Sequence, residues 1–89
     1  MIKVVRVTPL RECVLHLEFS DGSRGDYDLA LVIDRGGSMV EPLKDLVFFR
    51  RVFLEEGALT WPNGFDLGPT SLHRRLEEQG KLQRPRAAE

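Results

Sequence analysis

Residues 13–28 read CVLHLEFSDGSRGDYD, and this stretch decides the fold. Every second side chain from Cys13 to Phe19 is apolar, which is the period of a strand that buries one face. Ser20-Asp21-Gly22 then supplies residue types that favour a tight turn. The stretch therefore predicts a β-hairpin whose second strand covers about residues 23–28.

The loop length sets the register of this hairpin, and two lengths are compatible with the turn residues. A two-residue loop would place Leu17 opposite Asp26 and interrupt the apolar face. A three-residue loop, with Gly22 in the left-handed conformation as a bulge, keeps that face continuous. Because a slip of one residue turns every side chain to the other face, we choose the three-residue loop. It pairs Phe19 with Ser23, Leu17 with Gly25 and Leu15 with Tyr27.

The same register gathers polar side chains on the outer face. It sets Glu18 opposite Arg24 and His16 opposite Asp26, with Asp28 two residues further along that face. An imidazole beside two carboxylates could bind a divalent metal or transfer a proton, so one hypothesis is a metal-assisted hydrolase using His16, Asp26 and Asp28. A solvated cross-strand pair is the commoner origin of such neighbours, and the sequence offers no third firm ligand. We therefore assign no catalytic, cofactor-binding or metal-ligating residue and leave open whether the protein is an enzyme.

Two short helices are predicted after the hairpin. Asp28 is placed to cap the first, and Gly36-Gly37 ends it. The second has Asp45 as its cap and presents Leu46 and Phe49 on neighbouring turns.

Two further strand regions flank these elements. Residues 2–8 (IKVVRVT) are rich in β-branched side chains and predict a strand before the first hairpin. Residues 52–61 (VFLEEGALTW) predict a second hairpin around Glu56-Gly57. A two-residue turn there gathers apolar side chains on one face, but it requires a positive φ at Glu56, which is unfavourable. That face comprises Val52, Leu54, Leu59 and Trp61.

The last helix is predicted to start at Gly68-Pro69 and to end at Gly80. Residues 81–89 contain too few apolar side chains to pack, so we expect a disordered tail. The prediction is thus a single α+β domain over residues 1–80. It has a small antiparallel sheet from two β-hairpins, with two short helices and a C-terminal helix.

The segment Trp61-Pro62-Asn63-Gly64 has the residue order of a type I turn. Trp61 supplies apolar area to a core, and Asp66 is placed near the start of the last helix. This distinctive cluster is also the candidate for a partner-binding turn, formed by Trp61, Pro62, Asn63 and Asp66.

Composition narrows the classes of function. The 89 residues carry 13 basic and 14 acidic side chains, and this balance provides no overall field for nucleic acid. The stretch 71–89 has five basic and three acidic residues, so nucleic-acid binding through this basic C-terminal segment is a weaker alternative.

Cys13 is the only cysteine, which excludes a disulfide framework within the chain. The start at Met1 lacks a signal-peptide pattern and no apolar run has membrane-spanning length, so a cytoplasmic location is expected.

Three stretches of the chain resemble a bacterial family, the domain of unknown function 2442 (DUF2442). The first is LHLEFSDG at 15–22, followed by Tyr27-Asp28-Leu29. The second is Leu43-Lys44-Asp45, with Phe49 and Val52 after it, and the third is WPNGFDL at 61–67, with Leu72 after it. The resemblance spans about residues 2 to 73. Two departures are His73, where the family often has tyrosine, and the compact turn at 55–57, where many members have a longer loop.

The resemblance implies a small α+β protein without an established activity, often encoded beside another small protein. That context implies an antitoxin-like or regulatory accessory protein. The leading hypothesis is therefore a non-enzymatic protein-interaction or regulatory module. Its expected partner is a protein, for instance the product of an adjacent gene, and the exposed hairpin edges would also allow a homodimer. No cofactor is expected.

Overall fold

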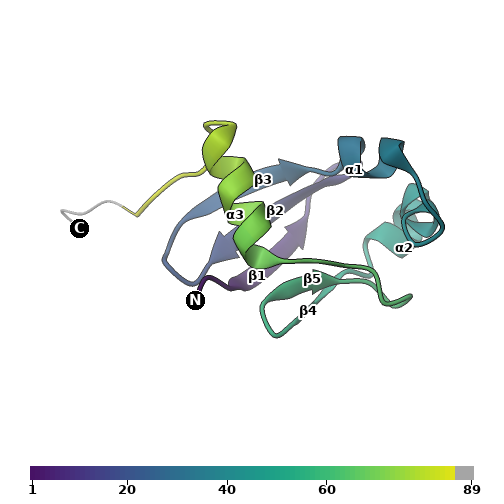
Figure 1. The fold of residues 1–89 in the computed structure, drawn as a ribbon, viewed down its shortest axis with the longest axis horizontal. Helices are drawn as coiled ribbons and strands as arrows, with labels where there is room; N and C mark the ends of the chain where they lie inside the picture. Colours follow the sequence, from purple (N-terminus) through teal and green to yellow (C-terminus); the bar gives the residue numbers. More distant parts are fainter. Residues whose placement is uncertain (86–89) are drawn as a thin grey trace.

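The computed structural model describes residues 1–85 (Figure 1). The strands are β1 (Val4–Pro9), β2 (Val14–Phe19), β3 (Arg24–Asp28), β4 (Phe53–Glu55), β5 (Ala58–Thr60) and β6 (Asp66–Leu67). The helices are α1 (Ala30–Arg35), the 3-10 turn η1 (Glu41–Lys44), α2 (Leu46–Phe49) and α3 (Pro69–Glu78). The strands form two antiparallel sheets, in the orders β1-β2-β3 and β4-β5-β6. The predicted α+β fold with a C-terminal helix is confirmed.

The first hairpin has the predicted register. β2 and β3 pair from Val14 opposite Asp28 to Glu18 opposite Arg24. Gly22 has a φ of 87°, in the left-handed region that the three-residue loop requires. The alternation of apolar side chains thus selected the correct loop length.

The second hairpin also has the predicted two-residue turn. Glu55 pairs with Ala58, and Glu56 and Gly57 have φ values of 51° and 83°. Positive φ at both central residues is the geometry of the turns that match the twist of paired strands. The unfavourable positive φ at Glu56 therefore belongs to a turn whose twist matches that of the paired strands.

Each hairpin gains a third strand, so the structure has two small sheets where the sequence analysis described one. β1 pairs with β2, with an irregularity between Val4 and Arg6, and β6 pairs with β5. The sheets meet where the backbone N–H of Val4 donates to the carbonyl of Gly57 at 2.9 Å. β1 lies beside β4 and β5 as a result (Figure 1).

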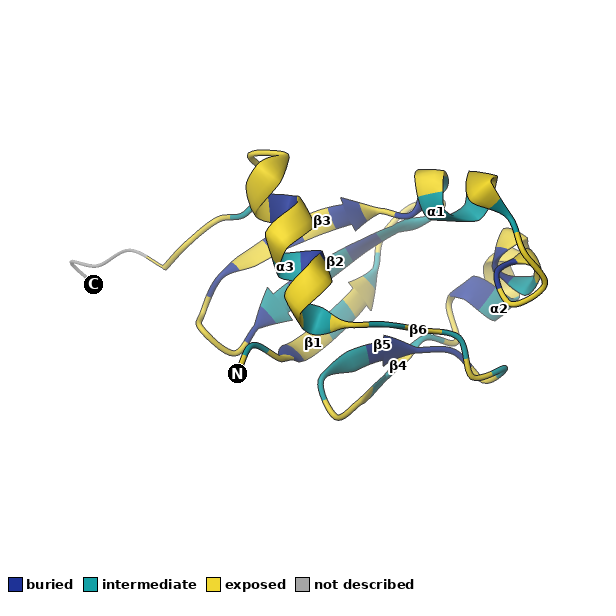
Figure 2. Cartoon of the chain, in the orientation of Figure 1, coloured by how far each residue is buried: buried dark blue, intermediate teal, exposed yellow. Residues whose placement is uncertain are grey.

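The hydrophobic core lies between the sheets and α3. The apolar face of the first hairpin is buried, and α3 crosses it with Leu72 and Leu76 inward (Figure 2). Trp61 and Phe49 fill the end of the core near α2, with ring centroids 6.1 Å apart. The face of the hairpin comprises Leu15, Leu17, Phe19 and Tyr27, all below 5% exposure.

The predicted cap at Asp45 is present, whereas Leu29 and not Asp28 is the N-cap residue of α1, and α2 presents its apolar residues differently from the sequence pattern. Asp28 accepts a hydrogen bond from the N–H of Ala30, and Asp45 accepts one from Val47, each at 2.9 Å. Phe49 is buried, whereas Leu46 is 46% exposed. The reason is that α2 is only one turn long, and Leu43 of the preceding η1 is buried in the core.

The packed part of the chain extends beyond Gly80, where the sequence analysis placed the start of a disordered tail. Gln83 forms an antiparallel bridge with Arg24, and Leu82 packs against the core. These contacts arise because the exposed edge of β3 offers backbone partners that composition does not reveal. Residues 86–89 lie outside the described part of the chain. No helix within residues 1–85 is long and apolar enough to cross a membrane.

Candidate functional site

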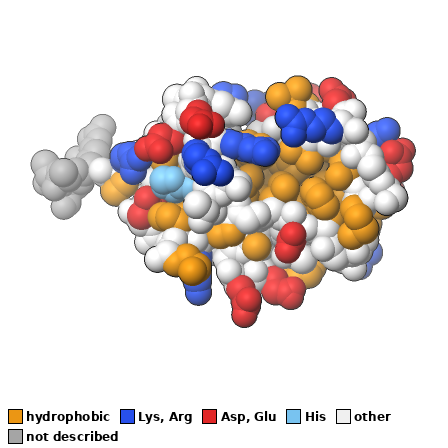
Figure 3. Space-filling model, viewed as in Figure 1, with side chains coloured by type: hydrophobic (Ala, Val, Ile, Leu, Met, Phe, Trp, Pro, Cys, Tyr) orange, Lys and Arg blue, Asp and Glu red, His pale blue; other side chains and the backbone are white. Residues whose placement is uncertain are grey.

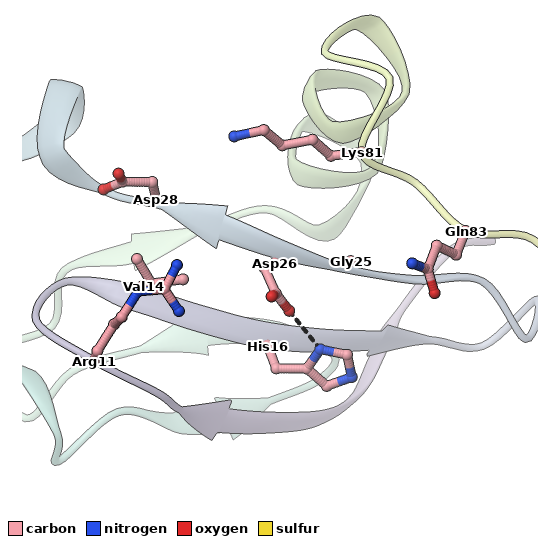
Figure 4. Close-up of a pocket in the computed structure, with 8 residues that line it drawn as sticks. All are labelled: Arg11, Val14, His16, Gly25, Asp26, Asp28, Lys81 and Gln83. Carbon is pink, nitrogen blue, oxygen red and sulfur yellow. Dashed lines mark hydrogen bonds and ion pairs between the residues drawn. The ribbon is translucent and has the colours of Figure 1, made fainter.

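A groove of about 390 Å³ runs along the outer edge of β3, between this strand and the segment that follows α3 (Figure 4). β2 and β3 supply one side of the groove, and the segment after α3 supplies the other. Polar and charged side chains predominate in its lining. They include Arg11, His16, Asp26, Asp28, Lys81 and Gln83.

His16 and Asp26 form a cross-strand pair in the groove, as the register predicted. Nδ1 of His16 lies 2.7 Å from Oδ1 of Asp26, and the side chains are 29% and 52% exposed. On its other side, Nε2 of His16 lies 4.0 Å from the carboxylate of Glu18, which in turn lies 3.9 Å from Arg6. These four residues form a row of polar contacts across the outer face of the first sheet, where solvent screens each contact.

Asp28 does not join this pair. Its Oδ1 accepts the N–H of Ala30 at 2.9 Å and the thiol of Cys13 at 3.3 Å, and its carboxylate points away from His16 in Figure 4. Within residues 1–85 no group of three or more His, Cys, Asp or Glu side chains is arranged to hold a metal ion. The predicted three-residue cluster therefore separates into a cross-strand pair and an aspartate that is bonded to Ala30 and Cys13, and the geometry gives no support to the metal-assisted hydrolase.

Cys13 is half-buried at the start of β2. Desolvation raises the pKa of its thiol, and the hydrogen bond to Asp28 raises it further. Because the thiolate is the reactive form of cysteine, both effects reduce its nucleophilicity at neutral pH. The side chain of Cys13 packs against the edge of the core instead.

Two of the four residues of the predicted partner-binding turn make hydrogen bonds within the fold. Trp61 is fully buried, and its Nε1–H donates to the carbonyl of Phe49 at 2.9 Å. The side-chain amide of Asn63 donates to the carbonyl of Met39 at 2.9 Å. Only Pro62 and Asp66 of the four predicted residues are exposed.

Two arginines of the basic C-terminal segment are paired with neighbouring side chains. Arg75 donates to the hydroxyl of Tyr27 at 3.0 Å, and Arg84 pairs with Glu77. Arg86 lies outside the described residues. These contacts give no separate support to nucleic-acid binding.

The sequence matches a family of proteins of unknown function, DUF2442, over residues 4–78. The chain belongs to the DUF2442 family. No curated protein and no solved structure matches it. The match covers both sheets and α3, so the groove beside β3 is built mainly from the part of the chain that defines membership of DUF2442.

One polar cluster of this DUF2442 protein was missed in the sequence. Nε2 of His73 on α3 lies 3.0 Å from Oδ2 of Asp21, and Oδ1 of Asp21 accepts the hydroxyl and the N–H of Ser23. The hydrogen bond from Ser23 is the main reason that the pKa of Asp21 falls to about 2. Serine here donates to the aspartate and not to the histidine, so the arrangement lacks an activated nucleophile. Its effect is to fasten α3 to the hairpin loop.

Proposed function

We propose that this protein is a protein-interaction module that binds an extended segment of a partner protein beside β3. The observation that supports this proposal is the groove along the outer edge of that strand. An exposed strand edge provides a row of backbone donors and acceptors, and many recognition domains use such an edge to bind a peptide.

The form of the groove favours a peptide over a small molecule. Sites for small molecules are usually concave, enclosed and mostly apolar. The groove beside β3 is open to solvent along the strand, and charged side chains such as Arg11 and Asp26 line it (Figure 4). A segment of chain could lie in it lengthwise without being enclosed.

A second exposed surface could extend such an interface. Apolar side chains are exposed on the stretch that contains α1 and α2, and hydrophobic atoms gather on this side of the molecule in Figure 3. Exposed apolar groups that lie close together are common where proteins associate. Those exposed by more than 40% are Leu31, Met39, Leu46 and Val47.

The regulatory, antitoxin-like role implied by the family resemblance is one form of this function. In that form the partner is the product of an adjacent gene, and the module changes that partner's activity by binding it. Co-expression of the tagged chain with that product, followed by size-exclusion chromatography with light scattering, tests the proposal. A stoichiometric complex is expected. If neither this product nor any other host protein co-purifies stoichiometrically, the proposal fails.

A further inference from the structure

The hydrogen-bonding pattern of β3 shows which of its backbone groups face the groove. In an antiparallel pair, residues alternate between those that bond to the neighbouring strand and those that face outward. The N–H of Phe19 donates to the carbonyl of Ser23, so Ser23 faces β2 and Arg24 faces outward. The same alternation turns the N–H and C=O groups of Asp26 and Asp28 outward.

Within residues 1–85, the chain pairs with only the first of these outward-facing residues. Arg24 exchanges two backbone hydrogen bonds with Gln83, at 2.9 and 2.7 Å. Among the described residues, the backbone N–H and C=O groups of Asp26 and Asp28 have no such partner. The edge of β3 therefore accepts an antiparallel segment at Arg24, while residues 1–85 provide no backbone partner for Asp26 and Asp28.

The segment after α3 cannot continue the pairing because it is needed to end the helix. Gly80 adopts a φ of 70°, and the N–H of Lys81 donates to the carbonyl of Leu76. The chain leaves α3 beside Gly25 and then runs away from Asp26, so its backbone pairs with β3 at Arg24 instead. The groove occupies the space that is left beside Asp26 and Asp28.

The side chains at these positions favour a basic partner segment. Asp26 and Asp28 are exposed on β3, and a residue on an added strand would lie directly opposite each of them. Lys81 lines the groove (Figure 4). It lies two residues before Gln83, and Asp26 lies two residues after Arg24, so Lys81 and Asp26 correspond in the antiparallel register of the Arg24–Gln83 bridge. A second copy of the chain, paired through the same edge, would instead place aspartates opposite aspartates, which is unfavourable.

We infer that the Asp26–Asp28 half of β3 binds an extended, antiparallel segment of a partner protein that carries a lysine or arginine opposite Asp26. This inference rests on the proposed function, and it adds the position, direction and charge of the segment. Backbone hydrogen bonds to the two aspartates supply affinity, and the basic side chain supplies selectivity.

The test uses the isotopically labelled full chain and synthetic peptides of alternating lysine and valine, or of alternating glutamate and valine. The lysine peptide should shift the amide signals of Asp26 and Asp28 and slow their hydrogen exchange. D26K should weaken its binding about tenfold relative to the unchanged chain. E55K is the matched control, since it makes the same charge reversal on an exposed strand of the second sheet, and it should leave binding unchanged.

Three outcomes would overturn the inference. The lysine peptide could leave the β3 amides unchanged, or bind D26K as well as it binds the unchanged chain. Alternatively, hydrogen exchange at the Asp26 amide could slow without peptide as the protein concentration rises. That result would identify a second copy of the chain as the segment bound to β3. A native partner that binds D26K undiminished would disprove this edge as its site while leaving the proposed function standing.

Discussion

His73 on α3 and Asp21 in the first hairpin loop are joined side chain to side chain, with Nε2 and Oδ2 3.0 Å apart. The imidazole also packs edge-on against Phe19, with ring centroids 5.0 Å apart. Together these contacts hold the first turns of α3 over the apolar face of the hairpin. The helix therefore has a polar attachment at the loop in addition to its two buried leucines.

Asp21 should make stability depend on acid pH, mainly because it accepts hydrogen bonds from Ser23 and to a lesser degree because of its contact with His73. Its pKa falls from 3.8 to about 2 on folding, so the carboxylate stabilises the fold above about pH 4, and this contribution is lost as the pH falls toward 2. Because the side chain is 32% exposed, solvent screening reduces the contribution to on the order of 1 kcal/mol. Urea unfolding at a series of pH values measures it. In D21N the free energy of unfolding should change less between about pH 4 and pH 2. An unchanged acid dependence in D21N would contradict the assignment of this effect to Asp21.

The elements that could be predicted from the sequence are those that local patterns specify. The alternation from Leu15 to Phe19 fixed the register of the first hairpin, because only one loop length keeps the face apolar. The same reasoning placed His16 opposite Asp26, which is the part of the candidate site that was predicted correctly.

Contacts between distant segments could not be predicted in this way. His73 and Asp21 are 52 residues apart, and no periodic pattern links them. The bridge between Gln83 and Arg24 uses backbone groups alone, so it leaves no compositional signal. The groove exists only because this bridge brings the segment after α3 beside β3, and the sequence analysis accordingly identified its residues but not its shape.

The turn of the second hairpin should respond in opposite ways to two substitutions. E56N should stabilise the protein by about 0.5–1 kcal/mol, because asparagine tolerates the left-handed φ of 51° better than glutamate does. G57A should destabilise it by about 1–3 kcal/mol, because a Cβ there would lie 2.6 Å from Cβ of Lys3 at a φ of 83°. Chemical denaturation measures both. A destabilised E56N would indicate that the Glu56 side chain makes a contact worth more than the backbone strain.

Trp61 should be a residue on which stability depends strongly. W61F leaves a cavity and removes the donor to the buried carbonyl of Phe49, so a loss of about 2–4 kcal/mol is expected. F53L is the control, because Phe53 is 44% exposed and its replacement should change stability by no more than about 0.5 kcal/mol. A small effect of W61F would mean that Trp61 is available for contact with a partner, as the sequence first indicated.

The last prediction separates a structural pair from a metal site at His16 and Asp26. A double-mutant cycle with H16A and D26A should give a coupling free energy of about 0.2–1 kcal/mol, because both side chains are partly exposed and screened. Added salt should weaken this coupling, since solvent-exposed charge pairs are sensitive to ionic strength. Zinc or manganese should not raise the melting temperature, since Asp28 is bonded elsewhere and no other described side chain completes a metal site. A metal-dependent rise that disappears in H16A, but persists in the matched variant H73A, would show that the groove binds a metal after all.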